Sequence, residues 1–301
     1  MSYRGPEFDV PQPRRFRHGP LAVALAVLVA GALLGWLVYE GVGGADGSPR
    51  AASSAPGLSG DDGKRGADTS SAAGGGALRG KVVVIDPGHN PGNVRHPAEI
   101  NRQVDIGTNR KECDTTGTST NAGYPEAKFT LDLAHRLRVL LQREGATVKL
   151  THDGDSPPWG PCVDERARIG NAAHADAAIS LHADGSAAGN RGFHVIMPGA
   201  VHAGAADTRR IVGPSHELGT RLKGAFARET GEAPADYLGE GTGLVTRTDL
   251  GGLNLSKVPK VFLECGNMRD STDAALLTSG AWRQKAARGI SEGIMSFLRE
   301  S

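Results

Sequence analysis

The sequence predicts a single α/β domain over residues 80–301, with a mainly parallel, twisted sheet flanked by helices. Short runs rich in β-branched residues, typical of buried strands, alternate in this region with longer segments whose apolar residues recur at helical spacing. Such alternation is typical of parallel sheets that are covered by helices on both faces. We expect a transmembrane or signal segment and a disordered linker to precede the domain.

The expected strands and helices follow one another along the domain. Residues 81–86 read Lys-Val-Val-Val-Ile-Asp and form the first expected strand, and Phe129, Leu133 and Leu137 mark the apolar face of the first long helix. Further strands are expected at 146–151, 177–182, 192–197, 244–246 and 260–264. Helices are expected at 124–144, 163–174, 215–230 and 280–299.

The N-terminal segment has the composition of a membrane-directed sequence. Residues 1–19 are polar and include four arginines, and the run from residue 19 to residue 39 carries no charge. At about 20 residues, this run is long enough to span a hydrocarbon core of roughly 30 Å. We expect 1–19 to be a basic cytoplasmic N-terminus and 20–42 a transmembrane anchor, with the rest of the chain outside the cytoplasm. Residues 43–45 form a passable cleavage site, so a removable signal segment is the alternative for 20–42.

Residues 43–79 have the composition of a linker. They are mostly Gly, Ser, Ala, Asp and Pro, and they show no apolar periodicity. Such a segment cannot bury enough apolar surface to offset the entropy that is lost when it is ordered. We interpret it as a flexible linker that tethers the domain of residues 80–301 to the N-terminal segment.

The charge balance and the cysteines exclude several classes of protein. The chain has 34 basic and 33 acidic residues, whereas proteins that bind nucleic acids carry a basic excess, so no nucleic-acid partner is expected. The three cysteines are too few for a disulfide-built miniprotein, and they lack the CxxC spacing of a structural zinc site.

Polar side chains follow the expected strands at the points where these strands end. His89 comes after the first strand, His182 ends the third, Glu264 ends the last, and Glu126 lies at the start of the first long helix. The carboxyl ends of parallel strands are where ligands bind in such sheets. Two histidines and one glutamate suit zinc and leave a position for water, and a further carboxylate would serve as general base. Each residue alone also has a structural explanation, so the spacing leaves both interpretations open.

Four sequence blocks resemble the signature of one enzyme family. They are Asp-Pro-Gly-His at 86–89, Tyr-Pro-Glu at 124–126, the stretch 165–184 ending in Ser-Leu-His-Ala-Asp, and Leu-Glu-Cys-Gly-Asn at 263–267. Together they resemble zinc-dependent N-acetylmuramoyl-L-alanine amidases, which cut peptidoglycan, over nearly all of residues 80–301. The stretches 113–126 and 160–166 are most similar to the short mycobacterial-type members.

The resemblance implies a role for each polar residue. His89, Glu126 and His182 would bind one zinc ion, and Glu264 would be the catalytic carboxylate. The substrate would be the amide between N-acetylmuramic acid and L-alanine in peptidoglycan or muropeptides. Two alternatives stay open, namely a zinc peptidase that cuts within the stem peptide and a wall-binding module that has lost catalysis.

Other residues have weaker functional expectations. Asp86 would orient a metal ligand or serve as a strand-end turn residue. Arg247 would bind a stem-peptide carboxylate or be a solvated surface arginine. Asn267 would hydrogen-bond the substrate or cap a loop. We expect Arg166 and Asn171 to make structural contacts.

The cysteines and the long loop complete the expectations. The resemblance places Cys113 and Cys162 in matching blocks, and we expect them to form a disulfide that pins loop 90–123 beside the active site. Cys265 should turn away from the site and be buried. A disulfide fits an extracytoplasmic protein, either anchored to the membrane or secreted to the cell wall or periplasmic space. Loop 90–123 is expected to shape or partly cover the substrate groove.

Overall fold

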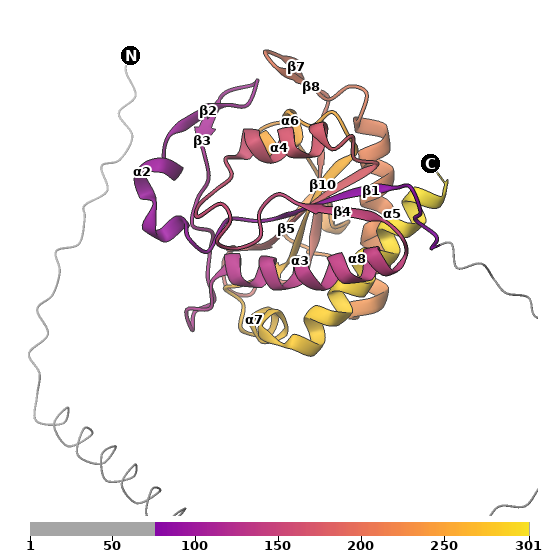
Figure 1. Ribbon diagram of the computed structural model, residues 1–301. Coiled ribbons are helices and arrows are strands. Elements are labelled where there is room, and N and C mark those ends of the chain that lie inside the picture. Colours follow the sequence, from indigo (N-terminus) through magenta and orange to yellow (C-terminus); the bar gives the residue numbers. More distant parts are fainter. Residues whose placement is uncertain (1–75, 301) are drawn as a thin grey trace, which may run out of the picture. The chain divides into compact units, whose positions relative to one another are not determined.

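A computed structural model describes residues 76–300 of the chain (Figure 1). The segments expected at 1–19 and 20–42, and nearly all of the linker expected at 43–79, lie outside the described residues. Among residues 76–300, no helix is both long and apolar enough to cross a membrane.

The centre of the domain is a six-stranded sheet with the strand order β4-β1-β5-β10-β6-β9. The first four of these strands are mutually parallel, β6 is antiparallel to β10, and β9 is parallel to β6. The strands are β1 Val82–Pro87, β4 Thr147–Leu150, β5 Ala177–Asp184, β6 His194–Pro198, β9 Leu244–Arg247 and β10 Lys260–Asn267. The α/β class and the mainly parallel sheet predicted from the sequence are confirmed.

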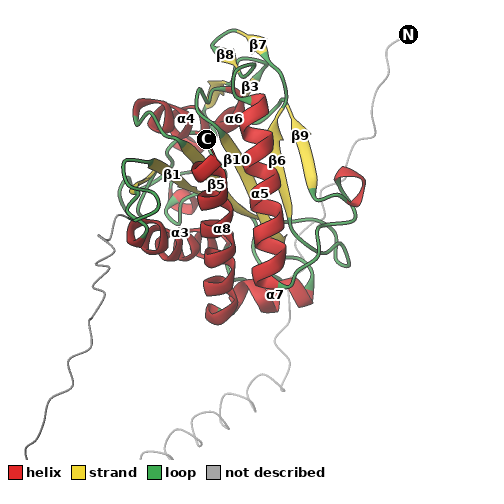
Figure 2. Ribbon diagram, turned by 90° about the vertical axis from the view of Figure 1, so that its right-hand side faces the viewer, coloured by secondary structure: helices red, strands yellow, loops and turns green. Residues whose placement is uncertain are grey.

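Helices cover both faces of this sheet, as Figures 1 and 2 show. One face packs on α3, α5, α7 and α8, which supply side chains to the main hydrophobic core. The opposite face carries α4 and α6, which contact each other. The helices are α3 Glu126–Arg143, α4 Val163–Ala172, α5 Val212–Thr230, α6 Gly251–Asn254, α7 Ser271–Thr278 and α8 Gly280–Glu300.

The loop expected at 90–123 has short elements of its own. It contains the 3-10 helix η1 Asn93–Arg95, the helix α2 Pro97–Ile100 and a hairpin of β2 Gln103–Asp105 and β3 Arg110–Glu112. A second hairpin, β7 His202–Ala203 with β8 Ala206–Asp207, and the 3-10 helix η2 Gly239–Gly241 follow later in the chain. The hairpin β2-β3 carries Val104, which packs with Ile106 and the two cysteines in a separate small hydrophobic cluster.

Strand alternation assigns the side chains of the sheet to its two faces. Val83 and Ile85 lie in the main core, whereas Val84 lies in a smaller cluster with residues next to α4. In the register of the sheet, Glu264 pairs with His182 on one side and with His194 on the other. Paired residues on neighbouring strands project to the same face, so these three side chains share the face of α4 and α6.

Two details differ from the sequence-based expectations. Residues 77–80 form a turn in which Leu78 is fully buried in the main core, so the folded region includes residues that were assigned to the linker. Helix α7 was not predicted, because its short sequence Ser-Thr-Asp-Ala-Ala-Leu-Leu-Thr has no helical apolar spacing. Its start is fixed instead by Asp270, whose side chain accepts hydrogen bonds from the N–H groups of Thr272 and Asp273.

Candidate metal centre and its cleft

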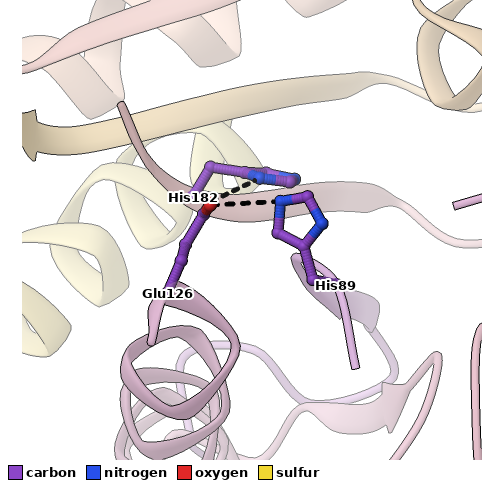
Figure 3. A group of neighbouring side chains, drawn as sticks. All are labelled: His89, Glu126 and His182. Carbon is purple, nitrogen blue, oxygen red and sulfur yellow. Dashed lines mark hydrogen bonds and ion pairs between the residues drawn. The ribbon is translucent and has the colours of Figure 1, made fainter. Parts of the chain in front are cut away.

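His89, Glu126 and His182 meet at one edge of the sheet, and Figure 3 shows both imidazole rings directed at the carboxylate. His89 Nε2 lies 3.2 Å from Glu126 Oε2, and His182 Nδ1 lies 3.0 Å from Glu126 Oε1. One possible ligand atom from each residue lies within 4.8 Å of the other two. Ligand atoms about 2.0–2.1 Å from a tetrahedral zinc ion would be roughly 3.3 Å apart, so this donor set fits zinc.

His89 is held by the loop that follows β1. Its backbone adopts a left-handed φ of 60°, which is uncommon for a residue other than glycine and is typical of functional positions. Its Nδ1 lies 3.1 Å from the carbonyl oxygen of Thr115 and 3.5 Å from Asp114 Oδ1. Hydrogen bonding at Nδ1 leaves Nε2 as the nitrogen that faces Glu126.

His182 presents the other ring nitrogen, Nδ1, to Glu126. Its Nε2 lies 3.2 Å from Ser180 Oγ, whose hydroxyl donates to Asp86 Oδ2 over 3.0 Å. This leaves Nδ1 as the nitrogen that faces Glu126. Ser180 precedes His182 by two residues on β5, so strand alternation directs both side chains to the same face.

Glu126 is the first residue of α3 and is almost completely buried. Its Oε2 accepts a hydrogen bond from the Thr118 N–H over 2.9 Å, and its Oε1 accepts one from the Ala183 N–H over 3.2 Å. The positive end of the helix also favours a carboxylate at this position. Burial raises the pKa of Glu126, but His89 and His182 outweigh this effect and hold the pKa well below its usual range.

The chain passes very close to this group at Gly117, which has a φ of 73°. A Cβ atom there would lie 2.7 Å from His89 Cδ2 and 2.8 Å from Glu126 Oε2. A larger residue would therefore displace the ligand atoms. The sequence Thr-Thr-Gly-Thr keeps the 115–118 segment against the cluster because its glycine supplies both the space and the left-handed conformation.

A buried network of charges lies beneath the cluster. Asp86 is completely buried, and its carboxylate lies 2.7 Å from Arg166 Nη1 and 2.9 Å from Lys260 Nζ. Burial alone would raise the pKa of Asp86, but Lys260 and Arg166 lower it far below its usual range. Arg166 also pairs with Asp114 over 2.8 Å and donates to the carbonyl oxygen of His89 over 3.1 Å.

Glu264 lies beside the cluster on β10 and lines the same open cleft. The cleft has a volume of about 440 Å³, and its lining includes His89, Glu126, His182, Asp184, Glu264 and Arg269. Burial raises the pKa of the Glu264 carboxyl well above its usual value, and the negative charges of Glu126 and Asp184 raise it further. Glu264 is therefore a carboxyl group that holds a proton more readily than an ordinary glutamate.

The other residues singled out in the sequence have structural partners. Arg247 forms a two-pronged pair with Asp249, with contacts of 2.6 and 2.8 Å, and it lies outside the residues that line the cleft. Asn267 is fully buried and donates to the carbonyl oxygens of Ala187 and Asn190. These contacts fit the loop-capping alternative for Asn267. Substrate binding by Arg247 or by Asn267 stays a prediction.

Arg166 and Asn171 make the structural contacts that were expected of them. Arg166 is the centre of the charge network, and Asn171 joins the carbonyl oxygen of Leu255 to the N–H of Lys257. Sequence reasoning missed Ser180 and Asp184, although both lie at alternate positions from His182 and could have been found from strand periodicity. It also missed Arg269, which follows the last strand outside any motif.

Cys113 and Cys162 form a disulfide, which is the pairing that the resemblance implies. The bond joins the residue before Asp114 to the residue before α4, so it connects the loop beside His89 to the helix that carries Arg166. Cys265 is a free, buried cysteine of the main core, as strand alternation predicts.

The fold and the cluster define a class of protein. An α/β domain with a His-Glu-His donor set at the carboxyl ends of parallel strands, next to a carboxyl group of raised pKa, is a metal-dependent hydrolase. The donor set is consistent with zinc.

Comparison with known proteins identifies the family. Residues 83–296 match the Amidase_3 family model, N-acetylmuramoyl-L-alanine amidase, and the chain belongs to this family. Its activity is therefore that of an N-acetylmuramoyl-L-alanine amidase acting on peptidoglycan, as the sequence blocks predicted. The family and the disulfide together indicate an extracytoplasmic location.

Individual relatives agree with this assignment. The chain is 42% identical over 223 residues to the N-acetylmuramoyl-L-alanine amidase Rv3717 of Mycobacterium tuberculosis, covering 73% of this chain and 88% of the relative. The crystal structure of the amidase Ami1 from Mycobacterium smegmatis matches with a TM-score of 0.67 and 40% identity, covering 74% of this chain and 99% of that one. Apo Ami1 from Mycobacterium abscessus matches with a TM-score of 0.66 and 39% identity, covering 73% and 100%.

Proposed function

We propose that His89, Glu126 and His182 bind one zinc ion and that Glu264 is the catalytic carboxylate of the amidase. The observation that supports this most strongly is the convergence of the three donor atoms within 4.8 Å, with the second nitrogen of each histidine engaged elsewhere. A histidine whose other ring nitrogen is hydrogen-bonded is oriented for metal binding. Asp86 would orient His182 through the Ser180 hydroxyl.

The residues of the cleft would share the chemistry of amide hydrolysis. Zinc, when bound, supplies a Lewis acid that polarises the scissile carbonyl and makes a water molecule more acidic. Glu264 would accept the proton of the attacking water on a carboxylate oxygen and later deliver it to the alanine nitrogen, which leaves only after protonation. The raised pKa of Glu264 suits both steps, because the carboxyl group must hold the proton between them.

One experiment tests the role of Glu264 and the identity of the scissile bond. We expect wild-type protein loaded with zinc to release peptides that begin with L-alanine from muropeptides, as measured by mass spectrometry. Glu264→Ala should bind one zinc ion and lose turnover by at least about 100-fold, because removal of a general acid–base typically costs 10²–10⁴-fold.

The outcomes separate the alternatives. Cleavage between amino acids of the stem would identify the zinc peptidase alternative, and binding to walls without any cleavage would identify the non-catalytic module. Near-normal turnover in Glu264→Ala would contradict the assignment of Glu264. Zinc content measured on both proteins controls for loss of the metal.

We also propose that the domain is tethered, with 1–19 in the cytoplasm, 20–42 as a transmembrane anchor and 43–79 as the linker to the domain at 80–301. The length of the uncharged run and the arginines before it support this organisation. We expect detergent, but not salt, to extract the full chain from membranes. A mature protein whose N-terminus begins after residue 42 would support the signal-segment alternative and contradict the anchor.

A further inference from the structure

Within the described part of the chain, the cleft combines several acidic side chains with a single side chain that is always positively charged. Among the described residues that line it, Glu126, Asp184 and Glu264 are acidic, and Arg269 is the one lysine or arginine. Carboxylates in the floor of a cleft repel an anionic ligand, so an anionic part of the substrate needs a cation nearby. Arg269 is the residue that can supply it.

The guanidinium of Arg269 is available for a ligand. The side chain is exposed, and it donates to Asn121 Oδ1 over 3.3 Å. Within residues 76–300, no carboxylate lies at ion-pair distance from it, whereas Arg247 is paired with Asp249 and Arg191 with Asp273. Most of the five N–H donors of Arg269 are therefore free to bind an anion.

The backbone of Arg269 is fixed by a buried residue. The N–H of Arg269 donates to Asn267 Oδ1 over 2.9 Å, and its carbonyl oxygen accepts a hydrogen bond from Asn121 Nδ2 over 3.3 Å. Asn267 is itself fully buried and bonded to Ala187 and Asn190. The start of the Arg269 side chain is thus held five residues beyond Glu264 on the wall of the same cleft.

The chemistry of the substrate indicates which anion this is. The lactyl carboxyl group of N-acetylmuramic acid is consumed in the scissile amide, so the negative charges near that bond are carboxylates of the stem peptide. The nearest belongs to the glutamate that follows L-alanine. We propose that Arg269 is a specificity-determining residue whose guanidinium binds this carboxylate in a bidentate manner. The inference rests on the proposed role of the Glu264 cleft as the active site.

Two substrates that differ by one charge test the inference. N-acetylmuramoyl-L-alanyl-D-isoglutamate carries the free carboxylate, and the D-isoglutamine analogue carries a neutral amide in its place. For zinc-loaded Arg269→Gln, we expect kcat/KM for the acid to fall about ten-fold, mainly through KM, since a charge-assisted hydrogen bond is lost. For the amide analogue, Arg269→Gln should have almost the same kcat/KM as wild type. Arg269→Lys should lose less on the acid than Arg269→Gln.

A matched control and a binding measurement complete the design. Arg288→Gln on the outer helix α8 removes an exposed arginine paired with Glu229 and should leave both substrates unaffected. An equal loss on both substrates, or no loss on either, overturns the inference. Calorimetric binding of the product L-alanyl-D-isoglutamate tests the role of Arg269 in the absence of turnover. Arg269→Gln should bind this product more weakly than wild type does. Equal affinity of the two proteins for the product overturns the role. Failure of wild type to cleave either substrate would instead contradict the proposed function.

Discussion

The two histidines of the cluster present different nitrogens to Glu126. His89 directs Nε2 at the carboxylate because its Nδ1 is engaged by Thr115, and His182 directs Nδ1 because its Nε2 is engaged by Ser180. The sequence blocks predict which residues meet, since His89 comes just after one expected strand and His182 ends another. They cannot predict which nitrogen is used, because this depends on a loop whose path follows from no periodicity.

The protonation of His89 leads to a prediction about metal binding. Burial lowers the pKa of His89, but Glu126 and Asp114 outweigh it and raise the pKa of the metal-free side chain to about 10. Zinc requires the neutral imidazole, so binding near neutral pH should release about one proton from this residue. Affinity should therefore rise about ten-fold per pH unit between pH 7 and pH 8.

Calorimetric titration of metal-free protein with zinc checks this prediction. At pH 7.5, the measured heat should vary with the ionisation enthalpy of the buffer, and the slope reports the protons released. Heats that are independent of the buffer would show that His89 is already neutral and would contradict the raised pKa.

At the scale of elements, the pairing of β10 between β5 and β6 creates the site. This arrangement sets Glu264 next to His182 and, on its other side, next to His194. Apolar runs and helical spacing were enough to predict the main strands and helices within a few residues. The reversed direction of β6 and β9 was not predictable, because strand direction depends on long-range pairing and not on local pattern. The hairpin β2-β3 is too short and polar to produce a periodic signal.

The contact between α5 and α8, which lie side by side in Figure 2, depends on glycine. A Cβ atom at Gly293 would lie 2.7 Å from the Cα atom of Leu222. Gly293→Ala should therefore force the helices apart and lower the free energy of unfolding by about 1–3 kcal/mol, as overpacking typically does. Urea unfolding of the zinc-loaded protein measures the change.

A second helical glycine provides the control. A Cβ atom at Gly224 of α5 would have no heavy atom within 4 Å. Gly224→Ala should leave stability unchanged or raise it by up to about 1 kcal/mol, because alanine favours helix more than glycine does. If Gly293→Ala were as stable as Gly224→Ala, the close approach of α5 and α8 would not limit the residue at this position.

At the scale of the whole molecule, the two faces of the sheet are stabilised differently. The face of α3, α5 and α8 buries an extended apolar core, whereas the face of α4 contains the buried charges of Asp86, Arg166 and Lys260. Breaking such a network by removal of one member is costly, because the partners stay buried without compensation. The cluster of His89, Glu126 and His182 lies next to these buried charges. Asp86 and Arg166, which orient the cluster, therefore also contribute to the pH dependence of folding.

Asp86 should make the domain sensitive to acid. Its pKa in the folded protein is lowered far below the unfolded value, so its stabilising effect is complete above about pH 4 and is lost as the pH falls below that value. Asp86→Asn should lower the free energy of unfolding at pH 7 by about 3–5 kcal/mol. The variant should also show a weaker loss of stability than wild type on acidification below about pH 4.

Urea unfolding at several pH values between 7 and 3 compares the two proteins. Asp155→Asn, at an exposed aspartate, is the matched control and should change stability by no more than about 0.5 kcal/mol. Parallel stability curves for wild type and Asp86→Asn throughout this range would show that Asp86 is not the source of the acid sensitivity.

The bond between Cys113 and Cys162 has a practical consequence for anyone who produces this enzyme. It joins two residues that are 49 positions apart, and it fixes Cys113, which Asp114 and Thr115 follow directly in the chain. The Asp114 carboxylate and the Thr115 carbonyl oxygen both contact His89 Nδ1. In a preparation made under reducing conditions, we expect the main apolar core to form, since neither cysteine belongs to it. We expect such a preparation to fold while the segment that holds His89 loses its covalent tie to α4. Metal content per chain, rather than yield or solubility, is then the measure of a correctly assembled batch.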